Sequence, residues 1–261
     1  MPSRAARILL GLWAALVLAF LFVPIGVVAA YAFNAANVQS WPIPGFSLRW
    51  FALAWGDREV AAALWLSLRA GALATLLAVL IGTAAALAVH RYRFAGRETV
   101  SLVLVLPIAL PGIITGMALN AFFTVAGLPL CFWTIVIGHA TFCIVVVYNN
   151  VLARLRRLPA SLVEASMDLG ADGWRSFRLV TLPLIAPALL AGALLAFALS
   201  FDEVIVTTFT AGAQNTLPLW IFGAIRLGQR LPEVNVVVLL VTLVTILPIL
   251  LAYRIVQRSD P

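Results

Sequence analysis

The sequence predicts an all-α membrane protein with six transmembrane helices. Of its 261 residues, 64% are apolar and only 10% are charged, which is far from the balance of soluble proteins. Several apolar runs exceed the ~18 residues that mark a helix able to cross a bilayer. A long polar stretch, residues 154–182, interrupts them between the fourth and fifth runs. The chain therefore belongs among polytopic helical membrane proteins.

Hydropathy places the six spans within one membrane domain covering residues 1–261. The spans run approximately over residues 8–33, 67–89, 99–126, 132–153, 183–212 and 234–256. The third contains Pro107, Pro111 and Gly112, so we expect it to be broken or bent. Broken helices occur in membranes where they line a cavity or pack inside protein. The break is therefore compatible with a translocation path and with plain helix packing.

The arginines predict the orientation of the chain. All 17 basic residues are arginines, and with a cytoplasmic N-terminus twelve of them lie on the cytoplasmic side and five on the other. This is the positive-inside bias of membrane proteins, so we expect both termini and residues 154–182 to be cytoplasmic. The bias also accounts for the net charge of +7, so no nucleic-acid partner is expected.

The sequence contains none of the common motifs for ATP binding, hydrolysis, or a metal or redox site. There is no G-x-x-x-x-G-K-[ST] sequence, so the chain has no P-loop for ATP. H-E-x-x-H and G-x-S-x-G are also absent, so no hydrolytic activity is indicated. Cys131 and Cys143 do not have the spacing of a metal or redox site. We expect neither catalytic residues nor a metal or cofactor bound by this chain.

Two acidic residues and a histidine lie well inside the apolar spans. Asp202 and Glu203 are about twenty residues into the fifth span, toward its outer half. One hypothesis is that at least one of them attracts a cationic amine along a translocation path; the other is that they lie at the outer interface or pair with Arg69. His139 is expected to form hydrogen bonds between helices, or alternatively to line the path.

The polar stretch has the pattern of two short helices separated by a glycine. The first is predicted from about Leu162 to Leu169, with Gly170 ending it in the left-handed conformation. Asp172 can cap a second helix that carries Trp174 and Phe177. Two helical turns are not stable alone in water, so this segment must be held by its own bundle or by a partner. It is either a docking element or an ordinary interfacial loop.

This stretch resembles the EAA signature of permease subunits of bacterial ABC importers. The matching positions are Glu164, Ala165, Leu169, Gly170, Ala171, Phe177, Leu182, Pro183 and Pro187. The sequence departs from the signature at Ser166, where the family usually has a second alanine, and at Ala188, where it often has glycine. Residues 106–116 and 193–209 further resemble the spermidine/putrescine branch of that family, in its second (C-type) permease subunit.

The resemblance implies a type I ABC-importer permease fold in a bacterial inner membrane, with a cytoplasmic coupling helix seated on an ATP-binding subunit. The implied coupling residues are Glu164, Ala165, Ser166, Asp168, Leu169, Gly170 and Ala171. The implied partners are two ATP-binding subunits that carry ATP and Mg, a homologous permease subunit and an extracytoplasmic solute-binding protein. The chain would then form a channel for polyamines that works by alternating access.

The sequence is also compatible with other functions and assemblies. The solute of such an importer could be one other than a polyamine, and the channel could be a homodimer or a heterodimer. A secondary transporter or channel that needs no ATP, or a membrane assembly subunit, would also fit the apolar pattern.

Overall fold

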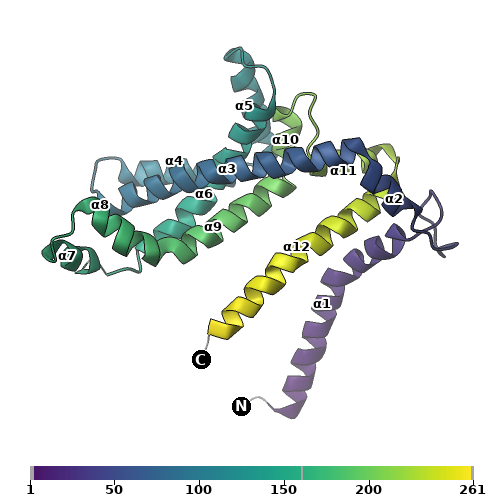
Figure 1. Cartoon of the computed structure of the whole chain (residues 1–261), viewed down its shortest axis with the longest axis horizontal. Helices are drawn as coiled ribbons and strands as arrows, with labels where there is room; N and C mark the ends of the chain where they lie inside the picture. Colours follow the sequence, from purple (N-terminus) through teal and green to yellow (C-terminus); the bar gives the residue numbers. More distant parts are fainter. Residues whose placement is uncertain (1–2, 160, 260–261) are drawn as a thin grey trace. The chain divides into compact units, whose positions relative to one another are not determined.

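The computed structural model describes residues 3–159 and 161–259, with side chains except at residue 5 and residues 247–259. Its regular elements are helices, and the described residues contain one isolated bridge, between Asn34 and Phe46 (Figure 1). The chain forms two compact units: residues 62–220 make the larger one, and the segments on either side make the smaller one. The expectation of a single membrane domain stays a prediction.

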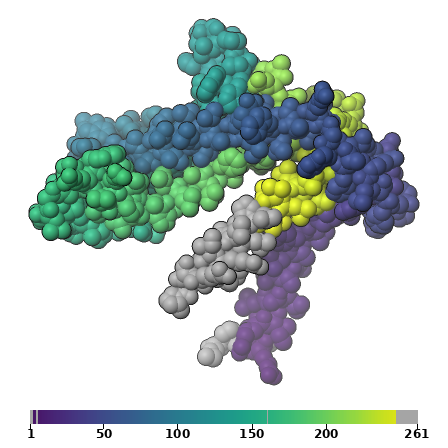
Figure 2. All heavy atoms as spheres, in the orientation of Figure 1, coloured from purple at the N-terminus to yellow at the C-terminus, as the bar shows by residue number. Residues whose placement is uncertain are grey.

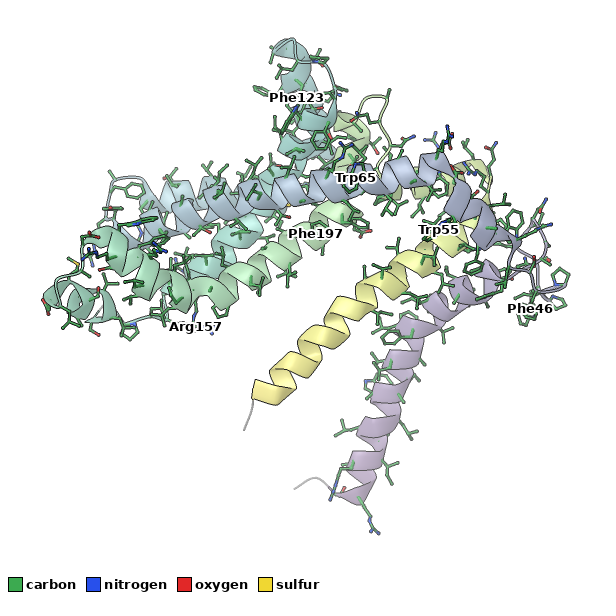
Figure 3. All side chains as sticks on the ribbon, viewed as in Figure 1. Phe46, Trp55, Trp65, Phe123, Arg157 and Phe197 are labelled. Atoms are coloured by element: carbon green, nitrogen blue, oxygen red, sulfur yellow. The ribbon has the colours of Figure 1, made fainter. Side chains whose placement is uncertain are left out.

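The smaller unit contains the long helices α1 (Arg4–Ala32) and α12 (Leu231–Ser259), the short helix α2 (Arg49–Gly56) and most of the short helix α11 (Leu217–Leu227). Both α1 and α2 pack against α12. Phe46 and Trp55 project from this unit (Figure 3) and are largely exposed. Exposed aromatic residues next to apolar helices suit the level of the lipid headgroups.

Arg230 organises the charged end of the smaller unit. Its guanidinium group forms ion pairs with Asp57, with Glu59 at 2.9 Å and with Glu233 at 2.8 Å. Glu233 lies in the first turn of α12, and Asp57 immediately precedes α3 (Arg58–Arg91). Because Asp57 and Glu59 lie at the start of α3 and Glu233 lies at the start of α12, the ion pairs of Arg230 connect the first turns of these two helices.

The larger unit is built around α6 (Phe132–Leu155), the most buried of its long helices. The helices packed against it include α4 (Arg97–Ala109), α9 (Leu182–Asp202) and α10 (Ile205–Thr210). Two glycines allow close approach to α6. A Cβ on Gly82 of α3 would lie 2.9 Å from the Ile144 carbonyl oxygen, and one on Gly192 of α9 would lie 3.3 Å from the Val147 Cα. Small residues let membrane helices pack through backbone contacts in this way.

The third predicted span is bent, as its prolines and glycine predict. Helix α4 ends at Ala109, and α5 (Gly112–Val125) leaves it at an angle of 106°. Pro111 has no backbone N–H and lies at the break. Helix α5 packs against α10, and Phe123 on its inner face is fully buried (Figure 3).

The fifth predicted span, residues 183–212, is two helices rather than one. Helix α9 ends at Asp202, and α10 begins three residues later at Ile205. Glu203 has an extended backbone, and its carboxylate accepts a hydrogen bond of 2.9 Å from the Val206 N–H. This side-chain cap satisfies a free amide at the start of α10, so the chain starts a new helix there instead of continuing α9.

Four described helices are long and apolar enough to cross a membrane, or five if α4 and α5 form one broken span. The four are residues Ala6–Ala32, Arg58–Arg91, Phe132–Leu155 and Gly173–Asp202. In α12 the apolar segment Leu231–Ile246 is shorter than the helices counted as spans. The total of six spans stays a prediction.

Candidate functional site

The predicted docking element is an exposed two-turn helix, α7 (Ser161–Asp168). Figure 2 shows it at the surface of the larger unit, in the green part of the chain. Ala165 and Asp168 are exposed, and the apolar side chain of Leu169 just after the helix is 90% exposed. An exposed leucine beside small residues is a feature that a partner can cover, as the docking hypothesis requires.

Gly170 ends α7 in the conformation that the sequence predicts. Its φ is +84°, and a Cβ there would meet no atom within 4 Å. The Gly170 N–H donates to the Met167 carbonyl at 2.9 Å, and the Ala171 N–H donates to the Ser166 carbonyl at 3.0 Å. This pair of bonds is a Schellman motif, which needs a left-handed residue at the position of Gly170. The glycine is therefore required for its backbone and not for lack of space.

Helix α7 is fastened to the next short helix, α8 (Gly173–Ser176), by a side-chain hydrogen bond. The Ser166 and Ser176 hydroxyl oxygens lie 2.7 Å apart, and Ser176 is buried. The Asp172 carboxylate accepts from the Arg175 N–H at 2.7 Å, which confirms Asp172 as the cap of the second helix. Ser166, which replaces an alanine of the signature, thus faces α8 and holds α7 in place instead of facing outward.

A continuous helical path connects this segment with α9. After α8 the chain forms a π-helical turn, η1 (Phe177–Thr181), and α9 follows at once with Pro183 in its first turn. The Trp174 and Phe177 rings, 5.6 Å apart, pack beside it. π-helical turns are rare and often mark functional positions. A displacement of α7 that is passed to α8 through the Ser166–Ser176 hydrogen bond can therefore reach the membrane-spanning part of α9 through the helical turns from Gly173 onward.

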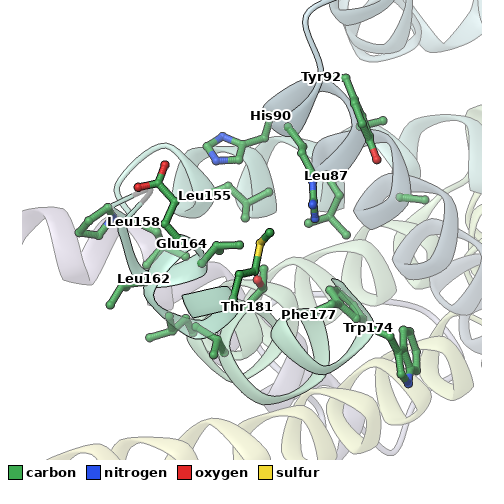
Figure 4. A pocket seen from close by; sticks show the side chains of 18 residues that line it. Leu87, His90, Tyr92, Leu155, Leu158, Leu162, Glu164, Trp174, Phe177 and Thr181 are labelled. Carbon is green, nitrogen blue, oxygen red and sulfur yellow. The ribbon is translucent and has the colours of Figure 1, made fainter. Parts of the chain in front are cut away.

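The signature glutamate is exposed and lies at the rim of a pocket. Glu164 lines a pocket together with residues at the ends of α3 and α6, and Figure 4 shows its carboxylate on the side where the His90 ring lies. The sequence predicts Glu164 as a coupling residue but does not indicate that His90, Arg91 or Ser176 lie near the coupling helix. They lie on other elements, and no motif joins them to Glu164.

The structure separates the roles of Asp202 and Glu203. Glu203 is half-buried and caps α10, so it has a structural task at the helix break. The Asp202 side chain is exposed at the end of α9, and no hydrogen bond or ion pair to it is found among the described residues. A carboxylate at a helix C-terminus is unfavourable because of the helix dipole. Arg69, which the sequence offers as an ion-pair partner for Asp202 or Glu203, instead forms cation–π contacts with the rings of Trp65 and Phe132.

His139 forms the interhelical hydrogen bonds expected of it. Its Nδ1 lies 2.7 Å from the Ser200 hydroxyl on α9, and its Nε2 lies 2.8 Å from the Thr207 hydroxyl on α10. The imidazole, fully inside the unit, thus joins the two helices on either side of the break at Glu203. This arrangement confirms the structural interpretation of His139.

Comparisons with known proteins agree with this arrangement. Residues 78–261 match the family described as "Binding-protein-dependent transport system inner membrane component". The chain is 33% identical over 255 residues to the spermidine/putrescine transport system permease protein PotC of Escherichia coli (strain K12), covering 97% of this chain and 95% of PotC. It is 36% identical over 250 residues to the putrescine transport system permease protein PotI of the same strain, covering 92% and 85% respectively.

The fold has a counterpart among solved structures. The chain aligns with a TM-score of 0.70 and 18% identity to a chain of a bacterial ABC transporter involved in the import of the acidic polysaccharide alginate, covering 100% of this chain and 99% of that one. The helical membrane fold expected from the sequence is thereby confirmed as that of a type I ABC-importer permease. The family match, the relatives and the fold together show that this chain belongs to the binding-protein-dependent transport system inner membrane components.

Proposed function

We propose that this chain is one membrane subunit of an ATP-driven importer of polyamines such as putrescine and spermidine. The curated relatives that cover most of its length are named for these solutes. A homologous permease subunit would complete the channel, two ATP-binding subunits would carry ATP and Mg, and an extracytoplasmic solute-binding protein would deliver the solute. The arginine bias supports cytoplasmic termini.

The observation that carries the proposal is the construction of α7. It presents Ala165, Asp168 and Leu169 at the surface, while Ser166 fastens it to α8 on its other side. A helix of two turns keeps its shape in water only when other elements hold it. Here it is held and still exposed, which suits a rigid element that docks on an ATP-binding subunit.

The path from α7 to α9 supports an alternating-access mechanism. Closure of the two ATP-binding subunits would displace α7, and η1 and α9 would carry the displacement into the membrane. His139 links α9 to α10 across the break at Glu203, so α10 would follow α9. The result would be alternate opening of the channel toward the solute-binding protein and toward the cytoplasm.

Within this mechanism Asp202 is the candidate contact for a polyamine ammonium group. Its exposed carboxylate has no partner among the described residues, although its place at the end of α9 is unfavourable for a negative charge. We expect Asp202→Asn to reduce putrescine uptake without loss of assembly. Glu203→Gln keeps an amide oxygen that can cap α10, so it is the matched control. Equal uptake by Asp202→Asn and the wild type would remove Asp202 from the path.

Docking is tested by co-purification of the chain with the candidate ATP-binding subunit in mild detergent. Wild type should retain that subunit, whereas Glu164→Arg and Gly170→Pro should lose it while the permease stays folded by circular dichroism. Radiolabelled putrescine uptake into vesicles, with and without internal ATP, then tests the transport reaction. Uptake driven by an ion gradient in the absence of ATP would instead support a secondary transporter.

A further inference from the structure

The pocket between α7 and the ends of the long helices is large enough for a bound molecule. It has a volume of about 710 Å³, within the range of about 300–1,000 Å³ typical of sites for small ligands. Its walls come from the last turns of α3 and α6, from α7, and from the α8–η1–α9 path. The walls are mainly aliphatic and include Leu87, Leu155, Leu158, Leu162, Met167 and Leu184 (Figure 4). An occupant must therefore have an apolar body.

The charged groups at the pocket favour an anionic head on that body. Arg91 and His90 line it, and the charges of Arg97 and Arg156 act on His90 from nearby. None of these three arginines forms an ion pair within the described part of the chain. Glu164 is the one acidic residue in the lining. The lining itself holds one arginine against one carboxylate, so the positive charge that complements an anion comes from Arg97 and Arg156, which act on His90 from outside the lining.

The position of the pocket indicates which kind of molecule with an apolar body and an anionic head can reach it. It lies at the ends of three candidate membrane spans, those of α3, α6 and the helical path ending in α9. Tyr92 and Trp174, the amphipathic aromatic residues typical of the lipid–water interface, are at its edge. Basic pockets between membrane helices on the cytoplasmic side are known to take anionic lipid headgroups.

We infer that the pocket binds a phospholipid with an anionic headgroup from the cytoplasmic leaflet, with an acyl chain among the leucines and the headgroup at Arg91. The inference rests on the proposed function for the cytoplasmic orientation of α7. Because the walls belong both to α7 and to the spans, the lipid fills the space between the docking element and the membrane helices. Its presence limits the motion of α7 relative to α3 and α6, so coupling of ATP hydrolysis to transport depends on anionic lipid.

The test uses the complete importer in nanodiscs of zwitterionic phosphatidylcholine, with or without phosphatidylglycerol. Native mass spectrometry measures the phosphatidylglycerol retained by the complex. Arg91→Gln should lower retention about fivefold, as expected for one fewer arginine next to an anionic headgroup. Ala88→Phe fills the pocket from α3 and should lower it as well. Arg93→Gln removes a nearby arginine that is not in the lining and should retain the lipid as the wild type does.

The second measurement is putrescine-stimulated ATPase activity. Wild type should lose several-fold of this stimulation in pure phosphatidylcholine, and Arg91→Gln should lose it even with phosphatidylglycerol present. Equal retention by Arg91→Gln and Arg93→Gln, or a cross-link between a Met167→Cys variant and an ATP-binding subunit inside the pocket, would overturn the inference. Uptake and assembly of the wild-type complex in nanodiscs with phosphatidylglycerol test the proposed function separately. An importer that transports putrescine but retains no phosphatidylglycerol selectively would refute the lipid site and leave the proposed function standing.

Discussion

Replacing Gly170 tests whether the backbone at the end of α7 determines docking. The φ of +84° lies in the left-handed region, which costs an L-residue about 1–2 kcal/mol, and more if it is β-branched. A Cβ at this position meets no atom within 4 Å, so Gly170→Val introduces backbone strain and no collision with neighbours. The two hydrogen bonds of the Schellman motif depend on this conformation.

The strain translates directly into docking affinity. Because two helical turns are only marginally stable, a cost of about 1–2 kcal/mol lowers the population of the docking-competent conformation of α7 by up to about 5- to 30-fold. The apparent dissociation constant of the ATP-binding subunit rises by the same factor, because only the competent conformation binds. Microscale thermophoresis of detergent-solubilised permease with labelled ATP-binding subunit measures this constant.

Two matched variants make the test specific. Asparagine tolerates the left-handed region, so Gly170→Asn should bind within about two- to threefold of the wild type. Gly173, at the start of α8, has no left-handed φ and open space around its Cβ, so Gly173→Ala should not weaken binding. The reasoning is refuted if Gly170→Val binds like the wild type, or if Gly173→Ala weakens binding as much as Gly170→Val does.

Three further substitutions test the packing of the larger unit, each by thermal unfolding in detergent. His139→Phe removes both hydrogen bonds across the helix break and should cost about 1 kcal/mol, and an unchanged melting temperature would show that this clamp contributes nothing. Glu203→Ala should cost about 1 kcal/mol through loss of the α10 cap, whereas Glu203→Gln should stay near the wild type; equal losses would contradict the capping role. Gly82→Ala places a Cβ 2.9 Å from the Ile144 carbonyl oxygen and should cost about 1–3 kcal/mol, while the control Gly11→Ala, with no atom within 4 Å of its Cβ, should leave stability unchanged or raise it by up to about 1 kcal/mol.

The local features of the coupling segment were predictable because their causes are local. The left-handed end at Gly170, the cap at Asp172 and the break near Pro111 each depend on a residue whose own backbone or side chain determines the outcome. The break after Asp202 was missed because the apolar pattern continues across it. Its cause, the Glu203 carboxylate capping α10, is also local, but neither hypothesis for this residue, a charge on the path or one at the outer interface or paired with Arg69, included a helix cap.

Contacts between distant segments were not predictable in the same way. Ser166 stands where the EAA signature usually has a second alanine, and nothing in the sequence indicates that it bonds to Ser176 and supports α7. His139 was expected to bond between helices, but hydropathy does not indicate that its partners are Ser200 and Thr207 on either side of a break.

The sequence by itself determined that this protein is a helical membrane permease with a helix–glycine–helix segment between its fourth and fifth apolar runs. Long apolar runs, arginine bias, turn residues and the EAA pattern are properties of consecutive residues, and each acts without the rest of the fold. Only the tertiary structure decided that Glu164 shares a pocket with His90 and Arg91, because packing of α3 against α6 and α7 brings these residues together. The proposed lipid site depends on that packing, which no run of consecutive residues encodes.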